Sequence, residues 1–419
     1  MTQAVKPNTI TGRIGIATRR NPPASVHNNP ILRLRMTKKP RTARKTMIDT
    51  RIPICEKEMR AGRLIGSSRT ILLSAIYIFF SQLTISLKRQ LVNTKSMNET
   101  IWRLVGLGQL SLLLEASSPK PGNVNRSASF SDMDYRHFLT SASLISRGLY
   151  ECASRGTKLA SGQISAKQVH LGELIELCAR DSLTGLNTKN TILGSILLYV
   201  PLTVAIASTI EQTSTFSTKS VKNQLSRIID NTSVDDSIHL YRTFQLTPPS
   251  GRKIKEEPEW TDLHSRYDFD NPDVISNIKN DEITLVSLFR MSAEIDEISN
   301  EWANYFPMVL NKIYPYLSRL STSLEDIEEA IVRTYIWLLS ERPDGLIIKK
   351  AGKKKAEEVQ QIAVEIVKGW NEDRELVQLV LRLDEELKVE GNLLNPGTTA
   401  DLVSATTLCR LVSLSHAQS

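Results

Sequence analysis

The chain has 419 residues, of which 41% are hydrophobic, so it is long enough to bury a substantial core. Its net charge of +8 is unevenly distributed: residues 1–96 contain 19 Lys or Arg and three acids, and residues 97–419 carry a net charge of −8. An acidic body argues against a nucleic-acid-binding protein. The four cysteines form no CxxC pair, which favours free thiols in a reducing cytoplasm over a zinc site.

Residues 1–96 are expected to form a basic, mostly disordered extension, because residues 1–63 are rich in Arg, Lys, Asn, Thr and Pro and lack periodicity. Within it, Thr70–Leu87 is an uncharged segment at the lower length limit of a membrane span. The segment has three possible interpretations. The first is a membrane anchor, the second is a core or interfacial helix, and the third is an upstream region that is not translated. We favour the third interpretation, with the true start at Met97, because charge and composition change abruptly there. The protein is then cytoplasmic; the first interpretation would tether it to a membrane.

Residues 97–419 are expected to form a single large all-α domain. Apolar residues recur at three- and four-residue spacing, and alternating strand patterns are scarce. Pro201 is expected to kink or interrupt its helix, and Thr322 with Glu325 predicts a capping box. The polar stretch 246–280 reads as a long connection. After a first helix that begins near residue 98, the expected helices are Phe138–Arg155, Lys167–Arg180, Asn190–Ile210, Ile283–Tyr305, Ser323–Ser340, Lys354–Lys368, Glu375–Lys388 and Thr399–Leu414.

The stretch Glu115–Asp134, EASSPKPGNVNRSASFSDMD, has the composition of a phosphate and metal site. Its prolines stiffen the backbone, its glycine permits a turn, its cations suit phosphate, and its carboxylates suit Mg²⁺ shared with phosphates. The alternative is a Pro-Gly turn followed by a helix that Ser131 or Asp132 caps. The candidate residues are Lys120, Gly122, Arg126, Asp132 and Asp134.

Three further loops carry polar groups next to expected helices. TGLNTKNTILG (184–194) places amides and hydroxyls at a helix start, where they bind phosphate or sugar, or simply cap the helix. RPDGLIIKKAG (342–352) contains Lys349 and Lys350, which are phosphate ligands or a solvated basic turn. GNLLNPGTTADLV (391–403) combines a turn at Asn395 with Asp401, an acid that the helix dipole favours in any case. Since the chain has no GxxxxGK[ST] motif, a nucleotide site has to be built from such loops.

Five ordered segments resemble the triphosphoribosyl-dephospho-CoA synthase family, especially its archaeal members. They are EASSPKPGNV (115–124), SDMDYRHF (131–138), NTILGSILLYVPL (190–202), PDGLIIKKAG (343–352) and NPGTTADL (395–402). The resemblance covers residues 98–419. The Asn-Thr pair of the family corresponds either to Asn187-Thr188 or to Asn190-Thr191.

The resemblance implies an all-α enzyme that moves the triphosphoribosyl group of ATP to the ribose 2′-hydroxyl of 3′-dephospho-CoA and releases adenine. It implies ATP as substrate and Mg²⁺ as metal. Breaking an N-glycosidic bond creates an oxocarbenium-like centre, which a carboxylate and a base assist. The implied catalytic residues are Glu115, Asp401 and Asp134; Asp132 and Asp134 bind Mg²⁺; Lys120, Gly122, Arg126, Asn190, Thr191, Lys349, Lys350 and Asn395 bind nucleotide.

Two other functions stay open at this point. The chain is alternatively a related Mg²⁺-dependent nucleotide transferase or nucleosidase with a different acceptor, or a non-catalytic nucleotide-binding protein. The sequence specifies neither the acceptor nor the pathway, and it is compatible with a homo-oligomer.

Overall fold

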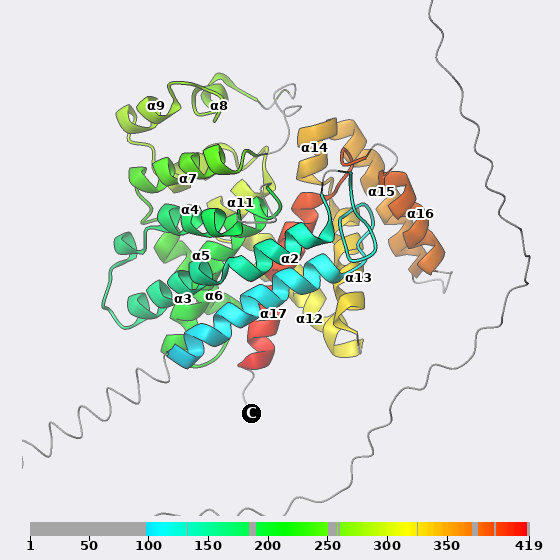
Figure 1. Ribbon diagram of the computed structural model, residues 1–419, viewed down its shortest axis with the longest axis horizontal. Helices are drawn as coiled ribbons and strands as arrows, with labels where there is room; N and C mark the ends of the chain where they lie inside the picture. Colours follow the sequence, from blue (N-terminus) through cyan, green and yellow to red (C-terminus); the bar gives the residue numbers. More distant parts are fainter. Residues whose placement is uncertain are drawn as a thin grey trace, which may run out of the picture. The chain divides into compact units, whose positions relative to one another are not determined.

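The computed structural model describes residues 98–131, 133–183, 190–249, 258, 260–324, 326–370, 376–388 and 391–416 (Figure 1). The regular elements in these ranges are helices, so the all-α prediction is confirmed. After a helix over 98–117, they are α2 (Tyr135–Leu144), α3 (Ser146–Ala160), η1 (Ala166–Val169), α4 (Leu171–Ser182), α5 (Leu193–Thr213), α6 (Thr218–Ile229), α7 (Val234–Leu246), α8 (Asp262–Arg266), α9 (Val274–Asn280), α10 (Leu285–Met291), α11 (Glu297–Ala303), η3 (Met308–Ile313), α12 (Tyr314–Ser323), α13 (Ile327–Glu341), α14 (Gly345–Ala351), α15 (Lys353–Trp370), α16 (Leu376–Lys388) and α17 (Gly397–Ser415).

Helix α5 forms the centre of the core. All its residues from Ser195 to Ile210 are buried, and it packs against α3, α4, α6 and α17. A helix that is apolar on all sides is stable in water only when other elements surround it. It is also the one described helix that is long and apolar enough to cross a membrane, but 94% of its apolar window is buried within the protein.

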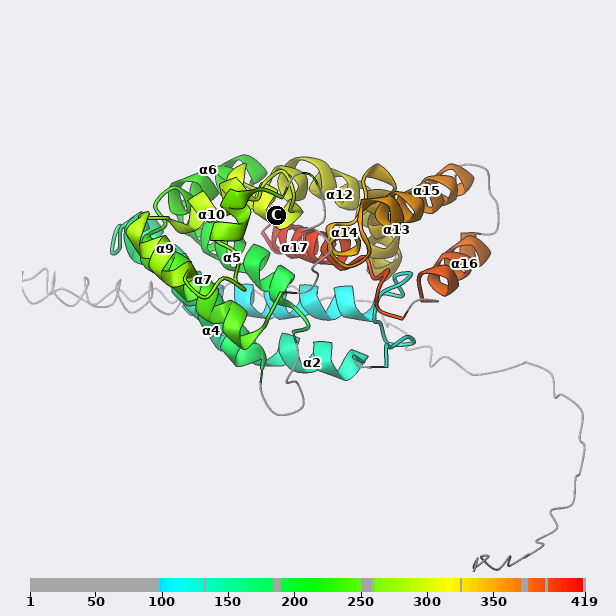
Figure 2. The same ribbon diagram turned by 90° about the horizontal axis from the view of Figure 1, so that it is seen from above.

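The other helices pack on two sides of α5 and α17. In both views α4, α7 and α9 lie on the left, whereas α13, α14, α15 and α16 lie on the right (Figures 1 and 2). On the left, α7 packs on α4 and α9; on the right, α15 packs on α13, α14 and α16. Between the two sides, the first turns of α5 and α17 and the helix α14 line a common cavity.

Two expected helices are each divided in the structure. Residues 138–155 are interrupted at Ile145, between α2 and α3, and residues 283–305 are divided into α10 and α11. Helix α11 starts anew because Asp296 caps it, with its Oδ1 atom accepting a hydrogen bond from the Ser299 amide at 2.7 Å. The stretch 246–280, expected as a connection, contains α8 and α9.

The helix cap predicted at Thr322 and an interruption at Pro201 are not found. Thr322 lies inside α12, and α13 is capped by Asp326, which accepts from the Glu328 amide at 2.8 Å. An aspartate one turn further along therefore replaces the expected Thr322 cap. Helix α5 also continues through Pro201 without interruption, because its packing on all sides outweighs the cost of a proline, about 3 kcal/mol.

Several predictions fall outside the described residues. These are the basic extension 1–96 with Thr70–Leu87 and Met97, and also Asp132, Glu325 and the Asn187-Thr188 pair. They stay predictions. The three described cysteines, Cys152, Cys178 and Cys409, are buried free thiols, as expected.

Candidate active site

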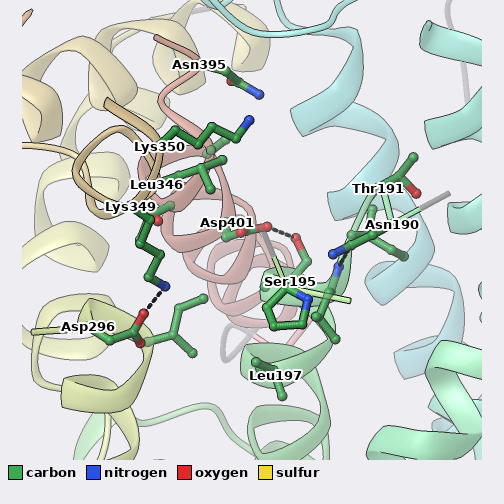
Figure 3. Close-up of a pocket in the computed structure, with 18 of the residues that line it drawn as sticks. Asn190, Thr191, Ser195, Leu197, Asp296, Leu346, Lys349, Lys350, Asn395 and Asp401 are labelled. Carbon is green, nitrogen blue, oxygen red and sulfur yellow. Dashed lines mark hydrogen bonds and ion pairs between the residues drawn. The ribbon is translucent and has the colours of Figure 1, made fainter. Parts of the chain in front are cut away.

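A cavity of about 330 Å³ lies where α5, α14 and α17 meet the end of the helix over 98–117 (Figure 3). Its charged lining consists of three carboxylates and two ammonium groups, and a further part of its lining is aromatic. Concave sites with a few converging polar groups are the usual sites of ligand binding. The charged residues are Glu115, Asp296, Lys349, Lys350 and Asp401, and the aromatic residues are Phe138, Phe244, Trp260 and Phe289.

Asp401, in the second turn of α17, faces the first turn of α5. The Ser195 hydroxyl donates to Asp401 Oδ1 at 2.5 Å, as Figure 3 shows. The two helices approach so closely that a Cβ atom on Gly194 would lie 2.0 Å from Asp401 Oδ2. Burial raises the pKa of Asp401 to about 7, and the negative charges of Glu115 and Asp344 add to the shift. Its carboxyl group can therefore exchange a proton near neutral pH.

Glu115, at the end of the helix over 98–117, is paired with Lys120. Lys120 belongs to the turn Pro119–Asn123, here called the PKPGN turn. Lys120 Nζ lies 3.0 Å from Glu115 Oε1 and also donates to the backbone carbonyl oxygens of Glu115 and Ser118. Lys120 is fully buried and does not line the cavity, whereas Glu115 does. In this structure Lys120 therefore neutralises Glu115 and presents no ammonium group to a phosphate in the cavity.

The two lysines of α14 point into the cavity, and each is held by a residue that was not predicted as a site residue. Lys349 forms an ion pair with Asp296, and Lys350 Nζ donates to Asn392 O at 3.0 Å. Burial alone would raise the pKa of Asp296, but Lys349 and the Ser299 hydrogen bonds bring it below its ordinary value. Asp296 is therefore anionic and holds the Lys349 ammonium at the cavity wall.

The PKPGN turn reaches the cavity through Asn123. Gly122 adopts φ +69°, a left-handed conformation that favours glycine, and its amide donates to Asp384 Oδ1 at 2.9 Å. Asn123 Nδ2 then donates to Asn395 Oδ1 at 3.1 Å, and both amides line the cavity. The turn thus connects the predicted residue Asn395 with Asn123. Asn123 belongs to the motif EASSPKPGNV but was not predicted as a site residue.

Asn190 and Thr191 line the cavity at the start of α5. Asn190 Oδ1 accepts from the Leu193 amide at 3.1 Å, and its Nδ2 donates to Pro248 O at 3.2 Å. Thr191 Oγ1 lies 2.7 Å from Ser141 Oγ. Asn190 therefore connects the first amide of α5 to the backbone at Pro248, in addition to lining the cavity.

Asp134 and Arg126 do not line this cavity. Asp134 is the N-cap of α2, and its two oxygens accept from the Arg136 amide at 2.9 Å and from Arg136 Nε at 3.0 Å. The Arg136 hydrogen bond lowers the pKa of Asp134 to about 2. Arg126 is half exposed and pairs with Glu328 at 2.8 Å. The helix cap of α2 is thus Asp134, not Ser131 or Asp132.

A resident Mg²⁺ site does not fit the described carboxylates. The oxygens of Asp134 are engaged by Arg136, and Glu115 and Asp296 are each paired with a lysine. The described residues contain no group of three or more His, Cys, Asp or Glu side chains that could hold a metal ion. The predicted partner, Asp132, lies outside them.

The fold and the cavity together define a helical protein that can bind a substrate with an anionic part and perform proton transfer at a carboxylate. The chain belongs to the ATP:dephospho-CoA triphosphoribosyl transferase family, whose profile matches residues 101–418. It is therefore a transferase of the triphosphoribosyl-dephospho-CoA synthase type, a family that uses ATP and dephospho-CoA.

The comparison with solved structures gives a crystal structure from Archaeoglobus fulgidus, described as that of a candidate triphosphoribosyl-dephospho-CoA synthase. The two chains are 23% identical, the match covers 66% of this chain and 98% of the other, and the TM-score is 0.43. The comparison with curated proteins found no match.

Proposed function

We propose that this cavity is where the triphosphoribosyl group of ATP is transferred to the ribose 2′-hydroxyl of 3′-dephospho-CoA. The observation that carries the proposal is the different environment of two carboxylates in one cavity. Glu115 is paired with the ammonium of Lys120, whereas Asp401 accepts from a hydroxyl and has a pKa of about 7. Carboxylates in contrasting environments perform different tasks in one reaction.

The reaction breaks the bond between C1′ and N9 of ATP, and adenine leaves with the electron pair. The 2′-hydroxyl oxygen of dephospho-CoA forms the new bond to C1′ and loses its proton, which departing adenine finally takes up. We assign to Asp401 the transient acceptance of this proton, because its pKa lies near working pH. We assign to Glu115 the stabilisation of positive charge at C1′, because its carboxyl group lines the cavity and Lys120 holds it in place.

The triphosphate is assigned to the α14 side of the cavity. Lys349, Lys350 and Asn395 line this side, together with the first turn of α17. Ammonium groups and helix N-termini both favour phosphate oxygens. Two lysines do not neutralise a triphosphate, so we propose that Mg²⁺ enters on the triphosphate as part of MgATP.

The test incubates the purified chain with MgATP, with and without 3′-dephospho-CoA. Free adenine and a triphosphoribosyl adduct are measured by liquid chromatography and mass spectrometry. Adenine together with the adduct is the expected result. Adenine without the adduct would indicate a nucleosidase or a different acceptor, and an absence of adenine from the folded, ATP-binding protein would overturn the proposal.

We further propose that the protein works in the cytoplasm, where buried free thiols such as Cys152 and Cys178 stay reduced. Fractionation of native cells and the intact mass of the protein test this location. A membrane-bound protein that retains residues 70–87 would contradict it.

A further inference from the structure

We propose that Phe138, Phe244 and Trp260 form a binding wall for the adenine ring of a substrate. These three side chains line the cavity and are partly exposed, and each comes from a different segment of the chain. The inference rests on the proposed function for the identity of the ligand, since ATP and dephospho-CoA are both adenine nucleotides.

Phe244, on α7, is fixed from behind. Its ring meets Tyr241 at a centroid distance of 5.7 Å and Phe269 at 6.2 Å, both edge to face. These contacts hold the phenyl ring in place while part of it stays exposed to the cavity. A fixed ring loses little conformational entropy when a planar ligand packs on it.

Trp260, just before α8, is fixed in a similar way. Its Nε1 donates to Ser265 Oγ at 2.9 Å, and its ring lies 5.2 Å from that of His264. The His264 ring is in turn hydrogen-bonded through Nδ1 to Thr261 Oγ1 and through Nε2 to Met291 O. The indole is thus held with its polar atom satisfied, and what it offers to the cavity is an apolar ring surface.

The cavity separates aromatic from charged groups. Its charged side chains come from the helix over 98–117, the cap of α11, α14 and α17, whereas within the described residues none comes from α2, α7 or the segment before α8. In both views α7, the helix that carries Phe244, lies on the opposite side of the molecule from α14, and α2 lies between them (Figures 1 and 2). A triphosphate is therefore attracted to the α14 side, and an uncharged, stacking group fits the other side.

A purine base matches this wall in shape and chemistry. Bases stack on aromatic side chains irrespective of hydrogen-bond pattern, and removing one stacked ring weakens nucleotide binding about 5- to 150-fold. The stacking also places the base away from the lysines, so that C1′ lies between the base and the triphosphate, in the cavity that Glu115 and Asp401 also line.

The test uses 2-aminopurine riboside triphosphate, whose fluorescence is quenched when its base stacks. Phe138→Leu, Phe244→Leu and Trp260→Leu each remove a ring and keep an apolar side chain. The matched control is Phe216→Leu, since Phe216 packs on Tyr314 at 5.4 Å and does not line the cavity. We expect the wild type and the control to bind and quench the probe, and the ring variants to bind it at least fivefold more weakly.

Steady-state kinetics on the same variants identifies the nucleotide. A rise in the KM for ATP alone assigns the ring to the adenine that leaves, and a rise in the KM for dephospho-CoA alone assigns it to the acceptor. If the wild type itself releases no adenine, the proposed function fails, and the probe affinities still decide the inference about the aromatic wall. Thermal melting identifies a ring variant that does not fold. The remaining two ring variants then test the proposal. Unchanged affinity and quenching in every folded ring variant would overturn the proposal.

Discussion

Asp401 differs from an ordinary acid near the start of a helix, because α17 begins at Gly397 and places Asp401 beyond its first turn. An exposed acid there simply benefits from the helix dipole. Asp401 instead faces the start of another helix and accepts a hydrogen bond from Ser195. Burial raises its pKa to about 7, and the charges of Glu115 and Asp344 add to the shift. At the scale of a single residue, burial and neighbouring charge thus convert an aspartate near a helix start into a group suited to proton transfer.

We expect Asp401→Asn to lower kcat/KM for ATP at least about 100-fold, because an amide cannot accept the proton. In the wild type, kcat/KM is expected to rise with pH and level off above about pH 7, as Asp401 ionises. Ser195→Ala removes a hydrogen bond that lowers the pKa of Asp401, so its pH profile is expected to move to higher pH. An Asp401→Asn variant with wild-type kcat/KM would exclude this role.

Lys120→Met is expected to destabilise the protein by about 3–5 kcal/mol, because it leaves the Glu115 carboxylate buried without its partner. The free energy of unfolding in urea measures the effect. Arg126→Met is the control: it breaks the half-exposed pair with Glu328 and should change stability by less than about 1 kcal/mol. Equal effects of the two changes would mean that burial of the Lys120 pair is unimportant.

At the scale of elements, α14 and α17 are joined through Asp344. Its Oδ1 accepts from the amides of Leu346 and Ile347, and its Oδ2 accepts from the amide and the hydroxyl of Thr399, both at 2.7 Å. One buried side chain therefore caps α14 and fixes it against the first turn of α17. This connection sets the position of Lys349 relative to Asp401.

Asp344→Ala is expected to lower the free energy of unfolding by about 2 kcal/mol or more, since it removes a helix cap and leaves buried donors on Thr399 unpaired. Asp326→Ala, which removes the exposed cap of α13, is the matched control and should cost about 1 kcal/mol. Urea unfolding of both variants measures the difference. Equal losses of unfolding free energy in the two variants would mean that the Asp344–Thr399 connection between α14 and α17 does not contribute to stability.

At the scale of the whole molecule, several buried acids affect how stability depends on pH. Burial raises the pKa of Glu301 to about 7, although the amides of Met308 and Val309 donate to it at 2.9 and 3.1 Å. An acid whose pKa is higher in the folded state stabilises the protein below its unfolded pKa, and this contribution is lost as pH rises through the folded pKa. Asp401 and Glu297 have shifts in the same direction.

We therefore expect the free energy of unfolding to fall between about pH 5 and pH 8. Glu301→Gln cannot ionise, so its stability should fall less over this interval, by at most about 1.4 kcal/mol per pH unit for the single group removed. Glu301 does not line the cavity, and activity should persist. Chemical unfolding at pH 5 and pH 8 provides the measurement, and parallel declines in the two proteins would show that Glu301 does not titrate in this range.

Much of the site was predictable because its residues lie in short, ordered motifs. Glu115, Asn190, Thr191, Lys349, Lys350, Asn395 and Asp401 all line one cavity, although they span nearly 300 positions of the chain. Asp296 and the aromatic wall were not predicted, because a helix cap and isolated rings resemble ordinary structural residues in sequence. Lys120 was expected to bind phosphate, and its burial beside Glu115 became visible only in the structure.

The sequence by itself determined the helical class of the protein and its family, because apolar periodicity and motif order are local properties of the chain. Only the tertiary structure decided which polar groups meet. Lys349 pairs with Asp296 across 53 positions, and Ser195 donates to Asp401 across 206. Such contacts depend on how α5, α11, α14 and α17 pack, and the interactions that hold those helices together are distributed over the whole core. The pKa of Asp401 follows from that packing, since burial is a property of the folded chain.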